Sequence, residues 1–238
     1  HDLVDRLLTL GRVAEATDVS RKLSDYDLLQ VADMFTTRGE ESVIESLIRE
    51  RLKDSPDHRL VVWLKQYALD RGDVEAALEI SEGLFWERPD IDRYQDLRSI
   101  AQQAGKWESL RTMVLQSLST AGSRSLLVRI FLDEDDIHRA LIVFDDMQAA
   151  DDRALWGFGN LQEKVAAAAE IPRPYEAVRL YLGIVERLIA ARGRGNYGSA
   201  AQYLIRIRDI YRRLDESKLW DQLIRALRDD HRRLPALQ

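Results

Sequence analysis

Glycine and proline recur at fixed intervals in the first half of the chain. Successive glycines at positions 39, 72 and 105 are 33 residues apart, and Pro56 and Pro89 each follow a glycine by 17 residues. Gly122 also follows Gly105 by 17 residues. Glycine ends a helix because it adopts the left-handed conformation at little cost, and proline ends one because it has no backbone N–H. A period of this length predicts a repeated unit of helix, tight turn, helix and turn.

The segments between these landmarks have helical periodicity. In residues 58–71 the apolar positions are three and four residues apart, which places them on one side of a helix. They are Leu60, Trp63, Leu64, Tyr67 and Ala68. Asp57 and Asp90 directly follow the two prolines and are expected to cap the next helices. No segment alternates between apolar and polar residues as a strand does, so the pattern predicts an all-α fold.

Outside residues 39–122 the period drifts and other residues take over the turns. Asp135 and Asp136 stand where a glycine turn is expected, and a longer helix begins at Pro174. The expected fold is an α-solenoid of about seven antiparallel hairpins, which forms a single domain over residues 1–238 with an interruption near 149–173. The expected helices span 2–10, 12–22, 25–37, 40–53, 57–71, 73–87, 90–104, 106–119, 123–133, 136–148, 153–169, 174–192, 196–214 and 216–232.

Composition excludes several classes of protein. The chain is 45% hydrophobic and 32% charged, which is enough apolar material for a core. It has no cysteine, so disulfides and thiolate zinc sites are excluded and a cytoplasmic location is expected. No apolar run approaches the roughly eighteen residues of a membrane span, and the N-terminus has no signal-peptide pattern. Because the chain does not begin with Met, we expect it to be a region of a longer protein.

Residues 192–199, RGRGNYGS, place three glycines in the spacing of a dinucleotide-binding loop, and the acidic pair at 215–216 follows at a suitable distance. Such a loop needs a strand before it, because the strand delivers the glycines to the N-terminus of a helix. The residues before Gly193 instead show helical spacing over a run that is too long for a typical strand. We therefore expect Gly193 to end one helix, Asn196 to cap the next, and no nucleotide or other cofactor to bind.

Other patterns that suggest catalysis or metal binding are incomplete. The acidic run at 133–136 lacks the central glycine and distal glutamate of a calcium loop and is expected to be a polar turn. The histidines at positions 1, 58, 138 and 231 have no zinc-ligand spacing, and no nucleophile elbow is present. We therefore expect no metal site and no enzymatic activity.

Basic residues are concentrated toward the C-terminus. Residues 173–238 carry 14 Lys and Arg against 8 Asp and Glu, a charge of +6, whereas residues 1–172 carry 21 against 33, a charge of −12. A basic end can attract an anionic partner, although such residues are also common on any solvated helix surface. Two arginines in the 192–199 loop and two away from the apolar side of the next helix are candidate contacts: Arg192, Arg194, Arg206 and Arg213.

The aromatic residues lie mostly on the apolar sides of the predicted helices and are expected in the core. Trp86 directly follows Phe85, and two neighbours on a helix cannot point in the same direction. Trp86 is therefore the candidate for an exposed aromatic side chain that anchors a partner.

Residues 25–122 resemble the tetratricopeptide repeat family. The residues that fall where this family places its turn, the start of its second helix and its terminal proline are Gly72, Asp73, Val74, Ala77 and Pro89. Lys65 and Leu84 depart from the pattern, because the family fills these positions with small residues. The resemblance is to the repeat class and implies a superhelical stack of hairpins.

The last fifty or so residues resemble the end of the helical region in bacterial SWIM zinc-finger proteins. The residues that carry this resemblance are Arg187, Leu188, Ile189, Arg194, Asn196, Tyr197, Ala200, Ala201, Leu204, Leu214, Trp220, Leu223, Leu227, His231 and Leu234. In such proteins a Cys/His zinc finger precedes the repeats, and the absence of cysteine places that finger outside this chain.

Two functions are compatible with these features. The first is a non-enzymatic scaffold whose concave surface, lined by the first helix of each hairpin, binds a protein or peptide. The alternative is an accessory nucleic-acid-binding module that uses the basic C-terminal third. Aromatic residues for base stacking are missing from the predicted exposed face of helix 196–214, which disfavours single-stranded ligands.

Overall fold

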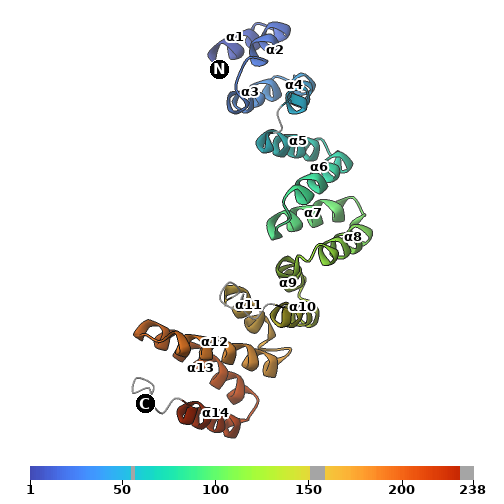
Figure 1. Ribbon diagram of the computed structural model, residues 1–238. Helices are drawn as coiled ribbons and strands as arrows, with labels where there is room; N and C mark the ends of the chain where they lie inside the picture. The colour runs from blue at the N-terminus through green and yellow to red at the C-terminus, as the bar shows by residue number, and fades with distance from the viewer. Residues whose placement is uncertain (55–56, 151–158, 231–238) are drawn as a thin grey trace. The chain divides into compact units, whose positions relative to one another are not determined.

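The structure is a computed structural model that describes residues 1–54, 57–150 and 159–230. Helices and the turns between them account for all regular structure in these ranges, so the all-α prediction is confirmed (Figure 1). None of the described helices is both long enough and apolar enough to cross a lipid bilayer.

The helix bounds agree with the sequence-based expectation to within two residues wherever the structure describes them. Residues 153–158 of the eleventh expected helix and 231–232 of the last lie outside the described residues. The helices are α1 (Asp2–Thr9), α2 (Val13–Ser20), α3 (Asp25–Thr37), α4 (Glu41–Asp54), α5 (His58–Asp70), α6 (Val74–Glu87), α7 (Ile91–Gln103), α8 (Trp107–Thr120), α9 (Arg124–Asp133), α10 (Ile137–Ala150), α11 (Gly159–Ala169), α12 (Pro174–Ala191), α13 (Arg194–Arg213) and α14 (Ser217–Asp230).

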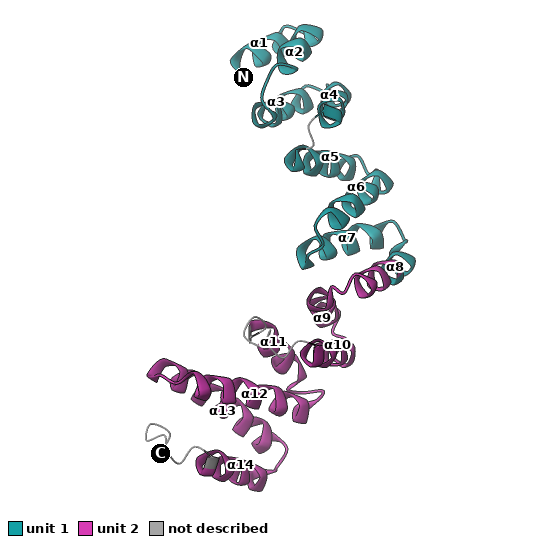
Figure 2. Cartoon of the chain, in the orientation of Figure 1, with its two compact units in different colours: residues 1–112 teal, residues 113–238 magenta. Residues whose placement is uncertain are grey.

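The chain divides into two compact units, residues 1–112 and 113–238, which Figure 2 shows in different colours. The boundary between the units falls within α8. The interruption expected near 149–173 lies partly on residues 151–158, which are outside the described residues.

Most turns within the hairpins contain one residue in the left-handed conformation. Gly72 has φ of +74°, and the N–H of Asp73 donates to the carbonyl of Ala68 at 2.8 Å. The turn between α9 and α10 has the same bonding without glycine, since Asp135 has φ of +58° and Asp136 N donates to the carbonyl five residues back at 2.8 Å. The expectation that aspartates replace the glycine turn here is confirmed.

Aspartate side chains begin the helices that follow the proline landmarks. The side chain of Asp57 accepts a hydrogen bond from Arg59 N at 2.8 Å, and that of Asp90 accepts one from Arg93 N at 2.9 Å. Each satisfies a backbone donor that the first turn of a helix leaves without an intrahelical partner. Both expected N-caps are therefore confirmed.

The core of unit 1 is a continuous apolar cluster along α1 to α5, and each helix contributes residues three and four apart. Lys65 is the exception on the packed side of α5, because its side chain is only 14% exposed. Its Nζ lies 2.7 and 2.8 Å from the two carboxylate oxygens of Asp96 on α7, and Ser81 of α6 donates to the same carboxylate at 2.8 Å. Lys65, which departs from the tetratricopeptide pattern, thus takes part in a contact that joins α5, α6 and α7.

In unit 2, α12 and α13 pack extensively against each other, and α11 packs on α12. Gln162 of α11 is 3% exposed and donates from Nε2 to the carbonyl of Leu180 at 2.7 Å. Gly183 allows this approach, because a Cβ at that position would lie 3.2 Å from the Gln162 nitrogen. The buried amide therefore fixes how α11 lies on α12.

Replacing Asp135 with Gly is expected to stabilise the protein by about 0.5–1 kcal/mol, because glycine adopts positive φ without the strain of a Cβ. Gly72→Ala should have the opposite effect by a similar amount, since φ is +74° there and nothing lies within 4 Å of an added Cβ. Urea unfolding of both variants measures the difference. A loss of stability in Asp135→Gly would contradict the equivalence of the two turns.

The pKa of Asp57 is lowered to about 2, chiefly by the hydrogen bond from the Arg59 side chain. Because this is below the value of an unfolded aspartate, about 3.9, the carboxylate stabilises the fold above about pH 4 and ceases to do so as the pH falls toward 2. Arg59 is exposed, so we expect only about 1 kcal/mol.

Urea unfolding at a series of pH values, compared with Asp57→Asn, measures this contribution. Asparagine keeps the helix cap and removes the titrating group. The difference in the free energy of unfolding between the two proteins should shrink between pH 5 and pH 2, and a difference that is independent of pH would refute the assignment.

Candidate functional site

In unit 1, side chains at equivalent positions of α3, α5 and α7 lie on the outward side of their helices. Residues 33 apart occupy the same place in successive hairpins, and steps of three and four residues keep them on one side of each helix. Most are exposed, Tyr26 by 58% and Val62 by 38%. We call this set the odd-helix face: Tyr26, Leu29, Asp33, Arg59, Val62, Gln66, Asp92, Gln95 and Ser99.

Contacts between these helices make the odd-helix face continuous. Helices α3 and α5 are in contact. The pKa of Arg59 is raised, first by its hydrogen bond with Asp57 and to a lesser extent by the charge of Asp25 on α3. The Lys65–Asp96 pair joins α5 to α7. The face carries apolar side chains at Tyr26, Leu29 and Val62, and charged or polar side chains at its other positions.

Trp86 on α6 is 38% exposed. Its ring meets that of Phe85 edge to face, with centroids 4.8 Å apart, and Phe85 is fully buried. Trp86 therefore lies at the rim of the core of unit 1 with part of its ring open to solvent.

The four candidate arginines separate into two pairs. Arg194 and Arg213 are the first and last residues of α13, so about 28 Å of helix lies between them. Arg192 and Arg194 flank the turn between α12 and α13, and both are exposed. The structure thus brings Arg192 close to Arg194, and Arg206 close to Arg213, but does not bring the pairs together.

Arg206 and Arg213 both reach the end of α11. Arg206 Nη1 donates to the hydroxyl of Tyr181 at 3.0 Å and to Glu170 at 3.3 Å, and its guanidinium lies 5.7 Å from the Tyr181 ring centroid. Arg213 Nη2 donates to the Glu170 carbonyl at 2.5 Å. The prediction recognised that these arginines lie off the apolar side of α13 but missed their contacts with residues some forty positions earlier.

Burial raises the pKa of the Tyr181 hydroxyl, and the neighbouring Glu170 carboxylate raises it further. The hydroxyl therefore stays protonated and donates to Glu170 at 2.6 Å while it accepts from Arg206. These three side chains tie α11, α12 and α13 together, so the arginine is part of the packing of unit 2.

The glycine-rich segment joins two helices, as expected, and the run before Gly193 is α12. One detail was wrong: Gly193 itself is the N-cap of α13, with φ of +102°, and the helix begins two residues earlier than predicted. Asn196 lies inside the first turn, where its amide donates back to the Arg192 carbonyl at 2.6 Å. That bond satisfies a carbonyl at the end of α12 rather than an N–H of α13.

The buried side of α13 differs in part from the one that helical spacing predicts, which is Tyr197, Ala200, Ala201, Leu204, Ile207, Tyr211 and Leu214. Ala200 and Ile207 are buried, whereas Ala201 is exposed and Ile210, which is not in that set, is 1% exposed. Tyr197, Leu204, Tyr211 and Leu214 are half-buried. Among the other aromatic residues Tyr67 and Trp107 are buried, Trp63, Tyr203 and Trp220 are half-buried, and Trp156 lies outside the described residues.

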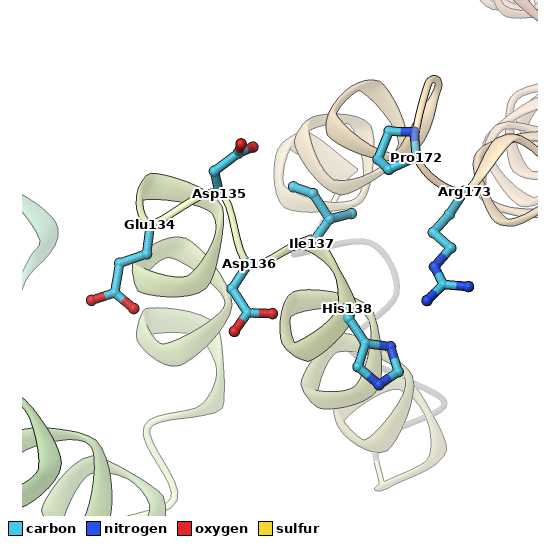
Figure 3. A pocket seen from close by; sticks show the side chains of 7 residues that line it. All are labelled: Glu134, Asp135, Asp136, Ile137, His138, Pro172 and Arg173. Carbon is cyan, nitrogen blue, oxygen red and sulfur yellow. The ribbon is translucent and has the colours of Figure 1, made fainter.

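A hollow of about 520 Å³ lies between the α9–α10 turn and the α11–α12 turn of unit 2 (Figure 3). Glu134, Asp135, Asp136 and His138 line one side, and Pro172 and Arg173 line the other. The carboxylates point in different directions in Figure 3. Within the described ranges no three His, Asp or Glu side chains converge so as to hold a metal ion.

The histidines have separate surroundings. His1 lies 3.1 Å from Asp27, and His58 and His138 are exposed in the first turns of α5 and α10. His231 lies outside the described residues.

Comparison of the chain with protein-family models finds no match, and comparison with curated proteins finds none either.

Tyr181→Phe is expected to lower the free energy of unfolding by about 1 kcal/mol, because a buried hydroxyl that both donates and accepts is lost. Tyr175→Phe is the matched control, since its hydroxyl also bonds a carboxylate, Glu216 at 2.7 Å, but the residue is 56% exposed. Thermal unfolding should show a shift of about 2–4 °C for Tyr181→Phe and less for the control. Equal shifts would show that the buried network adds nothing.

Proposed function

We propose that the protein is a non-enzymatic interaction scaffold and that the odd-helix face of unit 1 binds a segment of a protein partner. The observation that carries the proposal is the row of equivalent outward positions on α3, α5 and α7, which repeats every 33 residues. Repeated helices that expose matching positions suit a ligand that extends across them.

The chemistry of the face favours a peptide with an apolar anchor. Tyr26, Leu29 and Val62 provide apolar area, and Tyr26 also keeps a hydroxyl that can hydrogen-bond. Asp33 and Asp92 are exposed carboxylates on the same face. A partner segment that combines an aliphatic or aromatic residue with a basic residue would complement both features.

The proposal also covers how the helical hairpins are arranged. We infer that the hairpins stack as an α-solenoid of the tetratricopeptide class, in a cytoplasmic protein. The stacking is supported by the repeated turn geometry and by the packing of most helices on a neighbour in sequence. The resemblance to the helical region of SWIM zinc-finger proteins belongs to the same proposal.

Affinity capture from a cell extract, compared between the unaltered chain and Tyr26→Ala/Val62→Ser, tests the scaffold. Loss of two central apolar contacts at an interface is expected to weaken binding by about tenfold or more, so specific partners should disappear from the captured set. Peptides from a captured protein then allow the dissociation constant to be measured directly.

Glu50→Ala/Glu79→Ala is the control, because both side chains are exposed on even-numbered helices of unit 1 and lie away from the odd-helix face. Partners should be retained by this variant. If the two double variants lose the same partners, or if neither loses any, the odd-helix face is not the binding surface.

We propose nucleic-acid binding only as an alternative that uses Arg192 and Arg194. Of the four candidate arginines, Arg206 and Arg213 are engaged with Glu170. Only Arg192 and Arg194 lie free of such contacts within the described residues, which leaves few cations for phosphate contacts.

A further inference from the structure

Residues 187–208 contain five arginines and no acidic residue. The positive charges of such a stretch must pair with acidic residues elsewhere in the fold or remain available to a partner. Arg206 finds Glu170 at 3.3 Å, and Arg208 contacts the adjacent Asp209 at 3.0 Å. The other three arginines of the stretch are at positions 187, 192 and 194.

Arg187, Arg192 and Arg194 make no ion pair with a carboxylate within residues 1–54, 57–150 and 159–230. They lie near one another in the sequence at the end of α12, Arg187 in the last five residues of α12 and the other two on either side of the turn to α13. In this they differ from Arg179, Arg206, Arg208 and Arg212 of α12 and α13, each of which makes an ion pair.

Arg187 is held in place by a buried amide. Its Nη2 donates to Oε1 of Gln162 at 2.6 Å, and Gln162 is in turn fixed by its bond to the Leu180 carbonyl. A guanidinium has five N–H donors, so this single bond orients the group and leaves donors for a ligand. Because the side chain is half-buried beside Gly183, the orientation is built into the α11–α12 packing.

The charge on Arg187 is incompletely compensated by the protein. Burial lowers its pKa, and the only opposing influence is the neighbouring Glu186. A carboxylate brought by a ligand would replace the lost hydration and could bond two guanidinium N–H groups at once. Arg187 is thus prepared for an anionic group that approaches from solvent.

We propose that Arg187, Arg192 and Arg194 form a docking site for an acidic segment of a partner protein, with a carboxylate on Arg187 and further carboxylates at the exposed pair. A glutamate side chain is long and flexible enough to reach the recessed Arg187, whereas phosphates are fixed to a polymer backbone. The nearby Tyr197 and Tyr203 pack against Val185, Ile189 and Ala200 and are half-buried, which leaves little ring surface for stacking on bases.

This site lies in unit 2 and does not use the odd-helix face of unit 1, so the two proposals stand or fall separately. The probe is a fluorescent peptide of eight glutamates, with eight glutamines as the uncharged reference, and anisotropy at low salt reports binding. The unaltered chain should bind the glutamate peptide and not the glutamine peptide, and added salt should weaken the complex.

The test variant is Arg187→Gln/Arg192→Gly/Arg194→Ser. Glutamine retains a donor toward Gln162, and glycine accepts the positive φ of +55° at position 192. Loss of three charge contacts is expected to raise the dissociation constant by about tenfold. Arg192→Gly/Arg194→Ser alone leaves the buried contact untouched and should give a smaller, measurable rise even if the triple variant folds poorly.

Arg212→Ser is the control, because it removes a positive charge from α13 outside the site and its side chain is 71% exposed. It should change the dissociation constant by less than about twofold. The proposal is overturned if the chain fails to bind the glutamate peptide, if Arg212→Ser weakens binding as much as the site variants, or if a DNA or RNA oligonucleotide of the same charge binds more tightly than the peptide.

Discussion

The packing of each helix against its neighbours along the chain is the constraint on which the fold depends. A single amphipathic helix here cannot bury its apolar side, so the chain must reverse direction promptly and at the correct angle. Within most hairpins that reversal is made by a residue with positive φ, which is glycine at Gly72 and aspartate at Asp135. The spacing of such residues consequently sets the helix lengths and determines which positions point outward on successive helices.

Features encoded by local chemistry could be predicted from the sequence. The glycine turns, the caps at Asp57 and Asp90 and the aspartate turn at 135 each depend on residues a few positions apart. Helical periodicity also identified α12, and that excluded a dinucleotide loop at Gly193. On α13 the glycine cap moved the helix start, and the buried side includes Ile210 in place of Ala201, because a long helix contacts α12 and α14 along different sides.

The partner that each charged side chain contacts could not be predicted in this way. Arg206 and Arg187 both lie on long helices of unit 2, yet one reaches Glu170 and the other meets the amide of Gln162. The partner in each case lies 25 or more residues away, and only the packing of α11 decides which side chain it meets. Sequence identifies a surplus of positive charge, whereas the fold shows which cations remain for a ligand.

The Lys65–Asp96 ion pair holds α5 to α7 by attraction between charges, unlike the apolar contacts in the core of unit 1. Attraction between ions weakens as dissolved electrolyte rises, whereas hydrocarbon burial does not. The hold of α5 on α7 therefore depends partly on the medium, and so does that of α4 on α3, which Arg51 and Asp25 join at 2.8 Å. Because Lys65 is only 14% exposed, its attraction to Asp96 weakens with added electrolyte less than that of a fully solvated pair.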